Sequence, residues 1–267
     1  MIKVTRRNFL NTGLKALSIG TALLSGVVGG VLLKSGRKVQ AATESDAWTT
    51  KWQNHAWNFV VDTTKCIGCG KCVQACKTEN DVPYDAEVYR TWVERYRIER
   101  YRIGTDEKVL VDSPQGGINN FPKEPGDSKY TKAFFVPKLC NHCFKPPCVQ
   151  VCPVGATYST KEGVVLVDRG QCIGCGYCIQ GCPYGVRFMH PKLNVVDKCT
   201  WCYHRITKGM KPACVLVCPT GARLLDDVKA PNNQISKILE KERVGVLKQA
   251  MGTEPQVFYV GMDKVVN

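Results

Sequence analysis

Sixteen cysteines in four groups of four constrain the fold of this chain more than any other feature. The first group reads CIGCGKCVQAC and places Cys66, Cys69, Cys72 and Cys76 at the spacing C-x2-C-x2-C-x3-C. The other three groups are Cys140, Cys143, Cys148 and Cys152; Cys172, Cys175, Cys178 and Cys182; and Cys199, Cys202, Cys214 and Cys218. No cysteine lies outside a group, so one chemistry should account for all of them.

Disulfides, zinc and iron–sulfur clusters are the three chemistries that use many thiols. Thiols two residues apart in a tight loop pair poorly as disulfides, because the bridge requires a particular separation of the two backbones. Zinc sites use well-separated C-x2-C pairs and do not require a third cysteine two residues further on. The spacing seen here, followed by proline, is the pattern of bacterial ferredoxins, and Pro153, Pro183 and Pro219 follow three of the groups. The pattern therefore predicts [4Fe–4S] clusters.

The four groups alternate as two kinds of repeat. Group one, CIGCGKCVQAC, resembles group three, CIGCGYCIQGC, whereas groups two and four end in PPCVQVCPVGA and PACVLVCPTGA. Two duplicated ferredoxin units would leave this alternation. The sequence thus predicts an α+β fold of two ferredoxin-like units that together hold four [4Fe–4S] clusters.

The segment between groups two and three indicates how the groups pair. ATYSTKEGVVLVDRGQC reads as a strand, a Lys-Glu-Gly turn and a second strand, Val164 to Asp168, that leads into the next loop. Groups two and three are therefore expected to form one unit, residues 131–190. Groups one and four would form the other unit, residues 55–84 with 191–230. Serial pairing, one with two and three with four, stays open as an alternative, although 63 residues separate Cys76 from Cys140.

The remaining segments are expected to surround this framework. Asn58–Asp62 and Ala222–Leu225 should be the outer strands of the unit with groups one and four. An insertion, residues 85–130, contains the alternating stretch YRTWVERYRIERYRI, which favours an extended hairpin strand, and should lie outside the cluster framework. The C-terminal extension, residues 231–267, should form an amphipathic helix followed by the strand QVFYVG; the helix would bury Ile235, Ile238, Leu239, Val244 and Leu247. Trp48, Trp52, His55 and Trp57 are expected to pack against the cluster domain.

The N-terminal segment, residues 1–41, has the features of a twin-arginine export signal. Arg6 and Arg7 precede Phe9-Leu10 and an uncharged run of 18 residues from Ala16 to Leu33. Val39-Gln40-Ala41 offers a small-residue cleavage site, and the run is just long enough that a retained membrane anchor is the alternative. We therefore expect a periplasmic or otherwise extracytoplasmic protein, exported in folded form.

The net charge of +14 does not by itself indicate nucleic-acid binding. Residues 1–41 hold seven lysines and arginines and no acidic residue, which leaves +7 on the rest of the chain. Each cluster with four thiolates adds about −2, so four clusters would bring the remaining chain to about −1. The basic residues are thus expected to offset anionic clusters, and no nucleic-acid partner is expected.

The segments CKTENDVP, CNHCFKPPCVQVCPVGAT and CTWCYHRITKGMKPACVLVCPTGA together resemble the iron–sulfur subunit of the complex iron–sulfur molybdoenzyme family, of the dimethyl sulfoxide, polysulfide and tetrathionate reductase type. The resemblance covers roughly residues 55–262. It implies four [4Fe–4S] clusters that pass electrons between a polytopic membrane quinone-reactive subunit and a soluble molybdopterin or multihaem cytochrome subunit. Some relatives replace one cysteine and hold a three-iron cluster, but no position is replaced here. Lys77, not proline, follows Cys76, as is usual in the first group of the family.

The resemblance also implies which cysteines share a cluster, with the fourth ligand exchanged inside each unit. The four cysteine sets are set 1, Cys66, Cys69, Cys72 and Cys218; set 2, Cys140, Cys143, Cys148 and Cys182; set 3, Cys172, Cys175, Cys178 and Cys152; and set 4, Cys199, Cys202, Cys214 and Cys76.

No catalytic residue is expected, because no base, nucleophile or nucleotide-binding fingerprint accompanies the cysteines. The favoured function is that of an electron-transfer subunit of a respiratory complex, associated with the membrane through a partner or a retained N-terminal helix. A free-standing exported polyferredoxin is the alternative, and a zinc-stabilised nucleic-acid-binding or scaffold protein is a hypothesis from a different class.

Overall fold

The computed structural model describes residues 55–100, 107–118, 121–122 and 130–266. By its internal contacts the chain divides into two units, Met1–Glu44 and Ser45–Asn267, and the described residues all belong to the second. The expected export signal (residues 1–41), Trp48 and Trp52 lie outside the described residues. Within these residues no helix is both long and apolar enough to cross a membrane.

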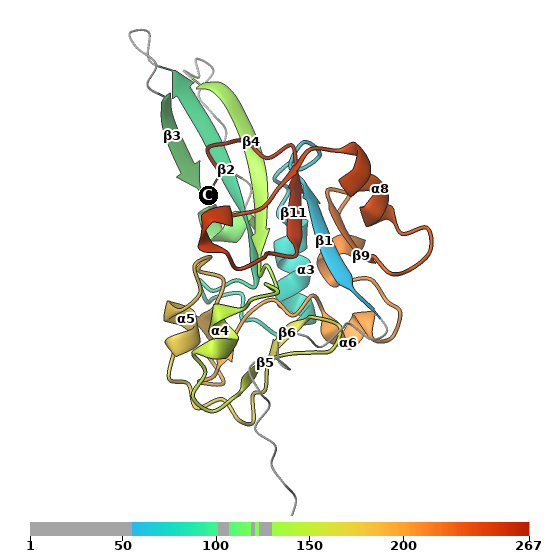
Figure 1. Cartoon of the computed structure of the whole chain (residues 1–267). Helices are drawn as coiled ribbons and strands as arrows, with labels where there is room; N and C mark the ends of the chain where they lie inside the picture. Colours follow the sequence, from blue (N-terminus) through green and yellow to red (C-terminus); the bar gives the residue numbers. More distant parts are fainter. Residues whose placement is uncertain (1–54, 101–106, 119–120, 123–129, 267) are drawn as a thin grey trace, which may run out of the picture. The chain divides into compact units, whose positions relative to one another are not determined.

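A four-stranded sheet pairs the first strand of the described chain with the last (Figure 1). Its strands lie in the order β10 (Val244–Gly245), β11 (Val257–Val260), β1 (Trp57–Asp62) and β9 (Arg223–Asp227). The two strands expected on the outside of one unit are β1 and β9, and they pair antiparallel, with Phe59 opposite Leu225. The C-terminal strand β11 pairs parallel to β1, which the sequence did not predict. The sheet buries Phe59, Val61 and Tyr259 completely.

The C-terminal helix is shorter than expected. Helix α8 spans Gln234–Lys241 and is capped by Asn233, whose side chain accepts a hydrogen bond from the Ser236 N–H at 2.7 Å. The expectation that Val244 and Leu247 continue the helix is wrong, because the backbone becomes extended at Glu242 and Val244 then pairs with Val260 in the sheet. Strand pairing has overridden the apolar periodicity of the segment.

A second sheet, in the order β3, β2, β4, contains the insertion. Strand β2 (Thr91–Arg100) forms a hairpin with β3 (Glu107–Asp112), as the alternating sequence predicted, and the turn η1 (Pro114–Gly117) follows. Strand β4 (Tyr130–Leu139) pairs with β2 from Glu99 opposite Tyr130 to Thr91 opposite Leu139. The sheet therefore takes its third strand from residues that the sequence analysis assigned to the second ferredoxin-like unit.

The insertion does not lie outside the cluster framework, as had been expected, but packs directly on the loop of group one. Gly68 and Gly70 of that loop have positive φ angles of +69° and +67°. A Cβ atom on Gly70 would lie 2.0 Å from the Gly117 carbonyl oxygen, and one on Gly68 would lie 2.4 Å from the Phe135 ring. Glycine is required at both positions, because the backbone is left-handed there and the second sheet leaves no room.

Short helices and hairpins carry the cysteine groups. The helices are α3 (Lys71–Glu79), α4 (Pro147–Gln150), α5 (Tyr177–Gln180), α6 (Tyr203–Ile206) and α7 (Ala213–Leu216). The hairpins are β5 (Thr157–Ser159) with β6 (Val165–Val167), which was predicted around the Lys-Glu-Gly turn, and β7 (Phe188–Met189) with β8 (Val196–Asp197); the turn η2 (Gln249–Met251) precedes β11. Helix α3 packs on α7 and α4 packs on α5. Group one is thus against group four, and group two against group three.

Candidate iron–sulfur cluster sites

All sixteen cysteines lie among the described residues, and every thiol is free of disulfide bonds. The four thiols of set 1 line one cavity, with Cys218 from group four facing the loop of Cys66, Cys69 and Cys72. In set 4, the Cys76 thiol is buried among the thiols of Cys199, Cys214 and Cys202, and the burial and these neighbours raise its pKa well above the usual value. The structure therefore brings the members of sets 1 and 4 together across two distant parts of the sequence.

The second pair of groups shows the same crossing in set 2. Burial raises the pKa of Cys143 to about 12, and the neighbouring thiols that raise it further are Cys140, Cys148 and Cys182. Set 3 lies nearest to solvent. Its Cys175 is exposed and its Cys178 is buried, while Cys152 accepts a hydrogen bond from the Thr157 N–H at 3.5 Å.

Hydrogen bonds act oppositely to burial on the pKa of two equivalent cysteines, the last members of groups two and four. Burial opposes ionisation of Cys218, but hydrogen bonds from Thr220, Ala222 and Arg223 outweigh it and lower the pKa of the thiol. The pKa of Cys152 is lowered in the same way by N–H groups of the turn that follows it. Each of these thiols is therefore prepared to act as a thiolate ligand.

Two buried arginines were missed by the sequence analysis. Arg187 and Arg223 each lie five residues after the last cysteine of their groups, in CPYGVR and CPTGAR, so a C-P-x-G-x-R repeat could have revealed them. Arg187 is 4% exposed, and its Nη2 donates to Cys148 Sγ at 2.9 Å. Arg223 is 2% exposed, and its Nη2 donates to Thr91 Oγ1 at 2.8 Å.

The arginines provide a test of whether the sites suit an anionic cluster. Nε and Nη1 of Arg223 have no hydrogen-bond partner among the described residues, although both are buried. Thiolates are the natural ligands of iron–sulfur clusters, and a cluster with four thiolates is an anion that accepts hydrogen bonds at its sulfur atoms. Four converging thiols beside a buried cation with unused N–H donors fit such a group. An isolated buried cation would otherwise be costly.

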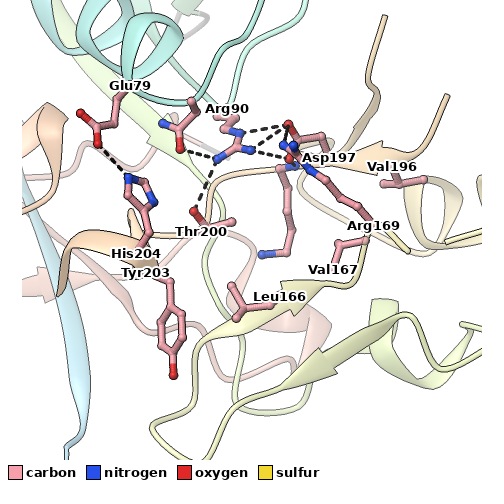
Figure 2. A pocket seen from close by; sticks show the side chains of 12 residues that line it. Glu79, Arg90, Leu166, Val167, Arg169, Val196, Asp197, Thr200, Tyr203 and His204 are labelled. Carbon is pink, nitrogen blue, oxygen red and sulfur yellow. Dashed lines mark hydrogen bonds and ion pairs between the residues drawn. The ribbon is translucent and has the colours of Figure 1, made fainter. Parts of the chain in front are cut away.

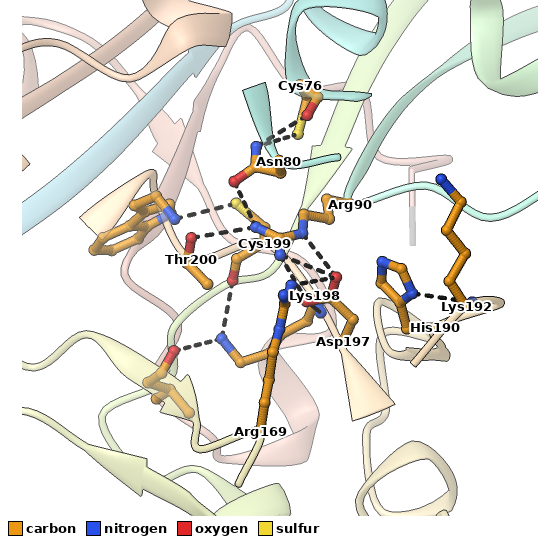
Figure 3. Close-up of polar contacts among 12 residues, drawn as sticks. Cys76, Asn80, Arg90, Arg169, His190, Lys192, Asp197, Lys198, Cys199 and Thr200 are labelled. Atoms are coloured by element: carbon orange, nitrogen blue, oxygen red, sulfur yellow. Dashed lines mark hydrogen bonds and ion pairs between the residues drawn. The ribbon is translucent and has the colours of Figure 1, made fainter. Parts of the chain in front are cut away.

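A polar network connects group one, the base of the insertion and group four (Figure 3). Asn80 Nδ2 donates to Cys76 Sγ at 3.5 Å, and Asn80 Oδ1 accepts a hydrogen bond of 2.6 Å from Arg90 Nη1. Arg90 also pairs with Asp197 at 2.9 Å, and both side chains are about 5% exposed. Removing one partner of such a buried pair typically costs about 3–5 kcal/mol. The network therefore fixes the position of Cys76 relative to the loop of Cys199.

A cavity of about 400 Å³ lies beside this network (Figure 2). Glu79 at the end of α3 lies on its wall and pairs with His204 of α6 at 2.7 Å and with Arg205 at 2.9 Å. The charged groups of the wall thus join the helix of group one to the helix of group four. They hold together the two segments that supply set 4.

Lys77 occupies the position where the other three groups have proline. Its side chain is buried, and Nζ donates to the carbonyl oxygens of Pro83 and Ala86 at 2.8 and 2.7 Å. It also lies 4.4 Å from the ring centroid of Tyr89. Lys77 therefore organises the chain as it leaves group one for the insertion.

An aromatic contact joins the loops of groups two and four. His142, in CNHC, packs against Trp201, in CTWC, with ring centroids 4.1 Å apart and the rings tilted by 30°. His142 Nδ1 accepts a hydrogen bond of 3.0 Å from the Val165 N–H, and burial lowers the pKa of the ring well below its usual value. The ring is therefore neutral at ordinary pH, and the contact is one of packing between the two units.

Comparison with known proteins defines the class to which these sites belong. Two family models described as 4Fe-4S dicluster domains match residues 65–156 and 131–228. The chain is thus a ferredoxin-like iron–sulfur protein, and its cofactors are four [4Fe–4S] clusters.

Relatives along most of the chain identify the family. A tetrathionate reductase subunit of Salmonella typhimurium is 40% identical over 211 residues, which cover 78% of this chain and 74% of that protein. The corresponding tetrathionate reductase subunit of Archaeoglobus fulgidus is 44% identical over 207 residues, with 78% and 83% covered. Protein NrfC of Escherichia coli is 36% identical over 259 residues, with 96% and 95% covered. The chain belongs to the family of iron–sulfur subunits of oxidoreductase complexes, as its motifs had suggested.

Proposed function

We propose that the chain is an electron relay in which the four cysteine sets, each binding one cluster, follow one another in the order set 1, set 4, set 2, set 3. Each cluster, when bound, takes up and releases single electrons without a change of ligands. The chain's own contribution is to hold the sites in sequence, to shield the inner sites from water and to expose the outer ones.

The proximity of thiols that belong to different sets supports this order. Within one unit, Cys214 of set 4 neighbours Cys72 of set 1, on the packed helices α7 and α3. Between the units, Cys199 of set 4 neighbours Cys140 of set 2, beside the packed rings of His142 and Trp201. In the other unit, Cys148 of set 2 and Cys178 of set 3 belong to one buried cluster of side chains.

The burial of the four sets is the observation that carries the proposal. All four cysteines of set 4 are buried, as are two of set 2, whereas sets 1 and 3 have one buried cysteine each. The two sets at the ends of the order are thus the two nearest to solvent. Electrons enter and leave there, while the inner sites are protected from water.

Exposed apolar side chains lie beside the sets at both ends of the proposed relay. Ile67, beside Cys66, is 59% exposed, and Ile173 and Tyr177, in the loop of set 3, are 64% and 62% exposed. Exposed apolar and aromatic side chains next to a redox site suit the docking of a partner protein. The partners are a polytopic membrane quinone-reactive subunit and a soluble molybdopterin or multihaem cytochrome subunit. The proteins named above as reductase subunits support this, since they too are parts of larger complexes.

Co-purification tests this function. The tagged full-length chain, isolated anaerobically from its native host after mild detergent treatment of membranes, is expected to retain a polytopic membrane subunit and a second redox subunit. The Ile173→Asp variant should lose one of these two subunits, because it places a charge on the exposed apolar surface beside set 3. A chain recovered entirely from the soluble fraction, as a cluster-loaded monomer, would favour the free-standing polyferredoxin.

The proposed location is the outer face of the cytoplasmic membrane, reached by folded export through the signal around Arg6 and Arg7. Replacing both arginines by lysine keeps the charge and removes the paired guanidinium groups. The cluster-loaded protein should then accumulate in the cytoplasm, as measured by fractionation and immunoblotting. Unchanged export of the double variant would reject this route. The size of the exported protein distinguishes a cleaved signal from a retained anchor.

A further inference from the structure

The guanidinium of Arg223 lies at the boundary between two cluster sites. It lines the cavity formed by the four thiols of set 1. It also neighbours Cys214 of set 4, and the thiolates of Cys72, Cys214 and Cys66 raise the pKa of the arginine above its usual value. One fixed positive charge therefore acts on two sites, and solvent does not screen it because the side chain is only 2% exposed.

The insertion sheet holds this charge in place. Thr91, the first residue of β2, accepts the hydrogen bond from Arg223 Nη2 and itself donates to the Lys138 carbonyl oxygen of β4 at 2.6 Å. Thr91 is 2% exposed. The remaining donors, Nε and Nη1, are left for the sulfur atoms of the sites.

Arg187 has the equivalent place in the other unit. Its Nη2 donates to Cys148 of set 2, and its Nη1 donates to Thr157 Oγ1 at 3.3 Å. Thiolates of set 2 and of Cys178 in set 3 raise the pKa of this arginine too. Each of the two arginines of the C-P-x-G-x-R repeats thus lies near the thiols of both cluster sites of its unit.

We propose that Arg223 raises the reduction potentials of the two clusters bound by sets 1 and 4, and that Arg187 does the same for sets 2 and 3; the inference rests on the proposed cysteine sets. One-electron reduction adds one negative charge to a cluster with its thiolates. A nearby fixed cation and N–H···S hydrogen bonds stabilise that reduced form, and both are known determinants of cluster potential. Arg223 and Arg187 therefore act on the reduction potentials of the clusters through their charge and their N–H groups, and they bind no iron.

The test is an anaerobic redox titration of the purified full-length holoprotein, followed by paramagnetic resonance. Cys66→Ser, Cys199→Ser and Cys172→Ser variants assign the signals of sets 1, 4 and 3, and the remaining signal belongs to set 2. In Arg223→Gln the midpoint potentials of sets 1 and 4 should both fall while those of sets 2 and 3 stay unchanged. Arg187→Gln is the matched control and should lower the potentials of sets 2 and 3 only.

Conservative variants separate charge from structure. Arg223→Lys keeps the charge and should shift the potentials of sets 1 and 4 less than Arg223→Gln does. Thr91→Val keeps the charge of Arg223 but removes the hydrogen bond that holds the guanidinium, together with the one to the Lys138 carbonyl oxygen, so it should lower the same two potentials by a smaller amount. If the Arg223→Gln variant fails to load its clusters, Thr91→Val is the variant that tests whether Arg223 raises the two potentials.

Two outcomes would overturn the inference, and they differ from a failure of the cysteine sets. If Arg223→Gln, or Thr91→Val in its place, carries full iron and sulfide and leaves all four potentials unchanged, the arginine does not tune them, whatever the ligand assignment. A fall confined to one cluster would reject the shared role. If the affected signals are instead those altered in Cys172→Ser, the assignment of cysteines to sets is wrong.

Discussion

Removal of iron and sulfide is expected to unfold the described part of the protein. The main core contains cysteines next to its apolar residues, among them Cys72, Cys140, Cys199 and Cys214. Burial raises the pKa of Cys199 to about 12 and that of Cys214 to about 11, so without iron both thiols stay protonated near neutral pH. The guanidinium groups of Arg187 and Arg223 would then remain buried without the anions that balance them.

The expected loss is comparable with the whole stability of a domain. An uncompensated buried charge costs about 3–5 kcal/mol, so two would cost about 6–10 kcal/mol. Native domains are typically stable by about 5–15 kcal/mol, and in metalloproteins the free energy of metal binding is also free energy of folding. Circular dichroism before and after anaerobic chelation should show the loss of the near-ultraviolet signal and of a cooperative melt.

Reconstitution provides the control for this experiment. Adding iron and sulfide under reducing conditions should restore both the signal and the melt, which excludes damage to the chain. An iron-free protein that melts cooperatively, close to the temperature of the holoprotein, would show that the fold does not depend on its clusters.

The cysteine ligands could be predicted from the sequence because the spacing within each group is a local feature. The sequence also predicted the β5–β6 hairpin from its turn signal, and the strands β1 and β9 from the pairing of groups one and four. The cysteine spacing predicted the cofactor and the family resemblance implied it as well, which the dicluster models confirmed.

Pairing between strands that are distant in the sequence could not be predicted in this way. Strand β11 inserts beside β1, and Val244 leaves the apolar helix period to pair with Val260. Both depend on contacts between residues far apart in the chain, which no local period encodes. The packing of Gly117 and Phe135 on the loop of group one likewise needed the three-dimensional arrangement.

The buried charges were missed for a different reason. From the sequence, the basic residues were expected only to offset the anionic clusters through their summed charge. Arg187 and Arg223 do this at specific places inside the protein, whereas Arg90 is buried with its own counter-charge, Asp197. A comparison of the residues after each fourth cysteine would have found the two arginines of the C-P-x-G-x-R repeats.

Replacing Cys218 by serine is expected to damage the same cluster as replacing Cys66 by serine. The two thiols line one cavity although 152 positions separate them in the sequence, and Cys218 lies in a turn that stabilises its thiolate. Serine oxygen is a harder ligand than thiolate. The affected site should therefore shift in potential or lose one iron and become a three-iron centre, while the other three sites keep their spectra.

Serial pairing makes a different prediction for the same variant. Cys218 would then share a cluster with group three, and its substitution would resemble Cys172→Ser. Cys172→Ser is thus the matched control, because it removes one thiol from a set at the opposite end of the proposed relay. All three variants should first be shown to hold iron and sulfide in at least three sites, so that only folded protein is compared.

Paramagnetic resonance of the three variants, recorded through one anaerobic redox titration each, tests the crossed cysteine sets on which the relay depends. The relay predicts that Cys218→Ser and Cys66→Ser alter one and the same signal and that Cys172→Ser alters another. A Cys218→Ser spectrum that matches Cys172→Ser and differs from Cys66→Ser would contradict it.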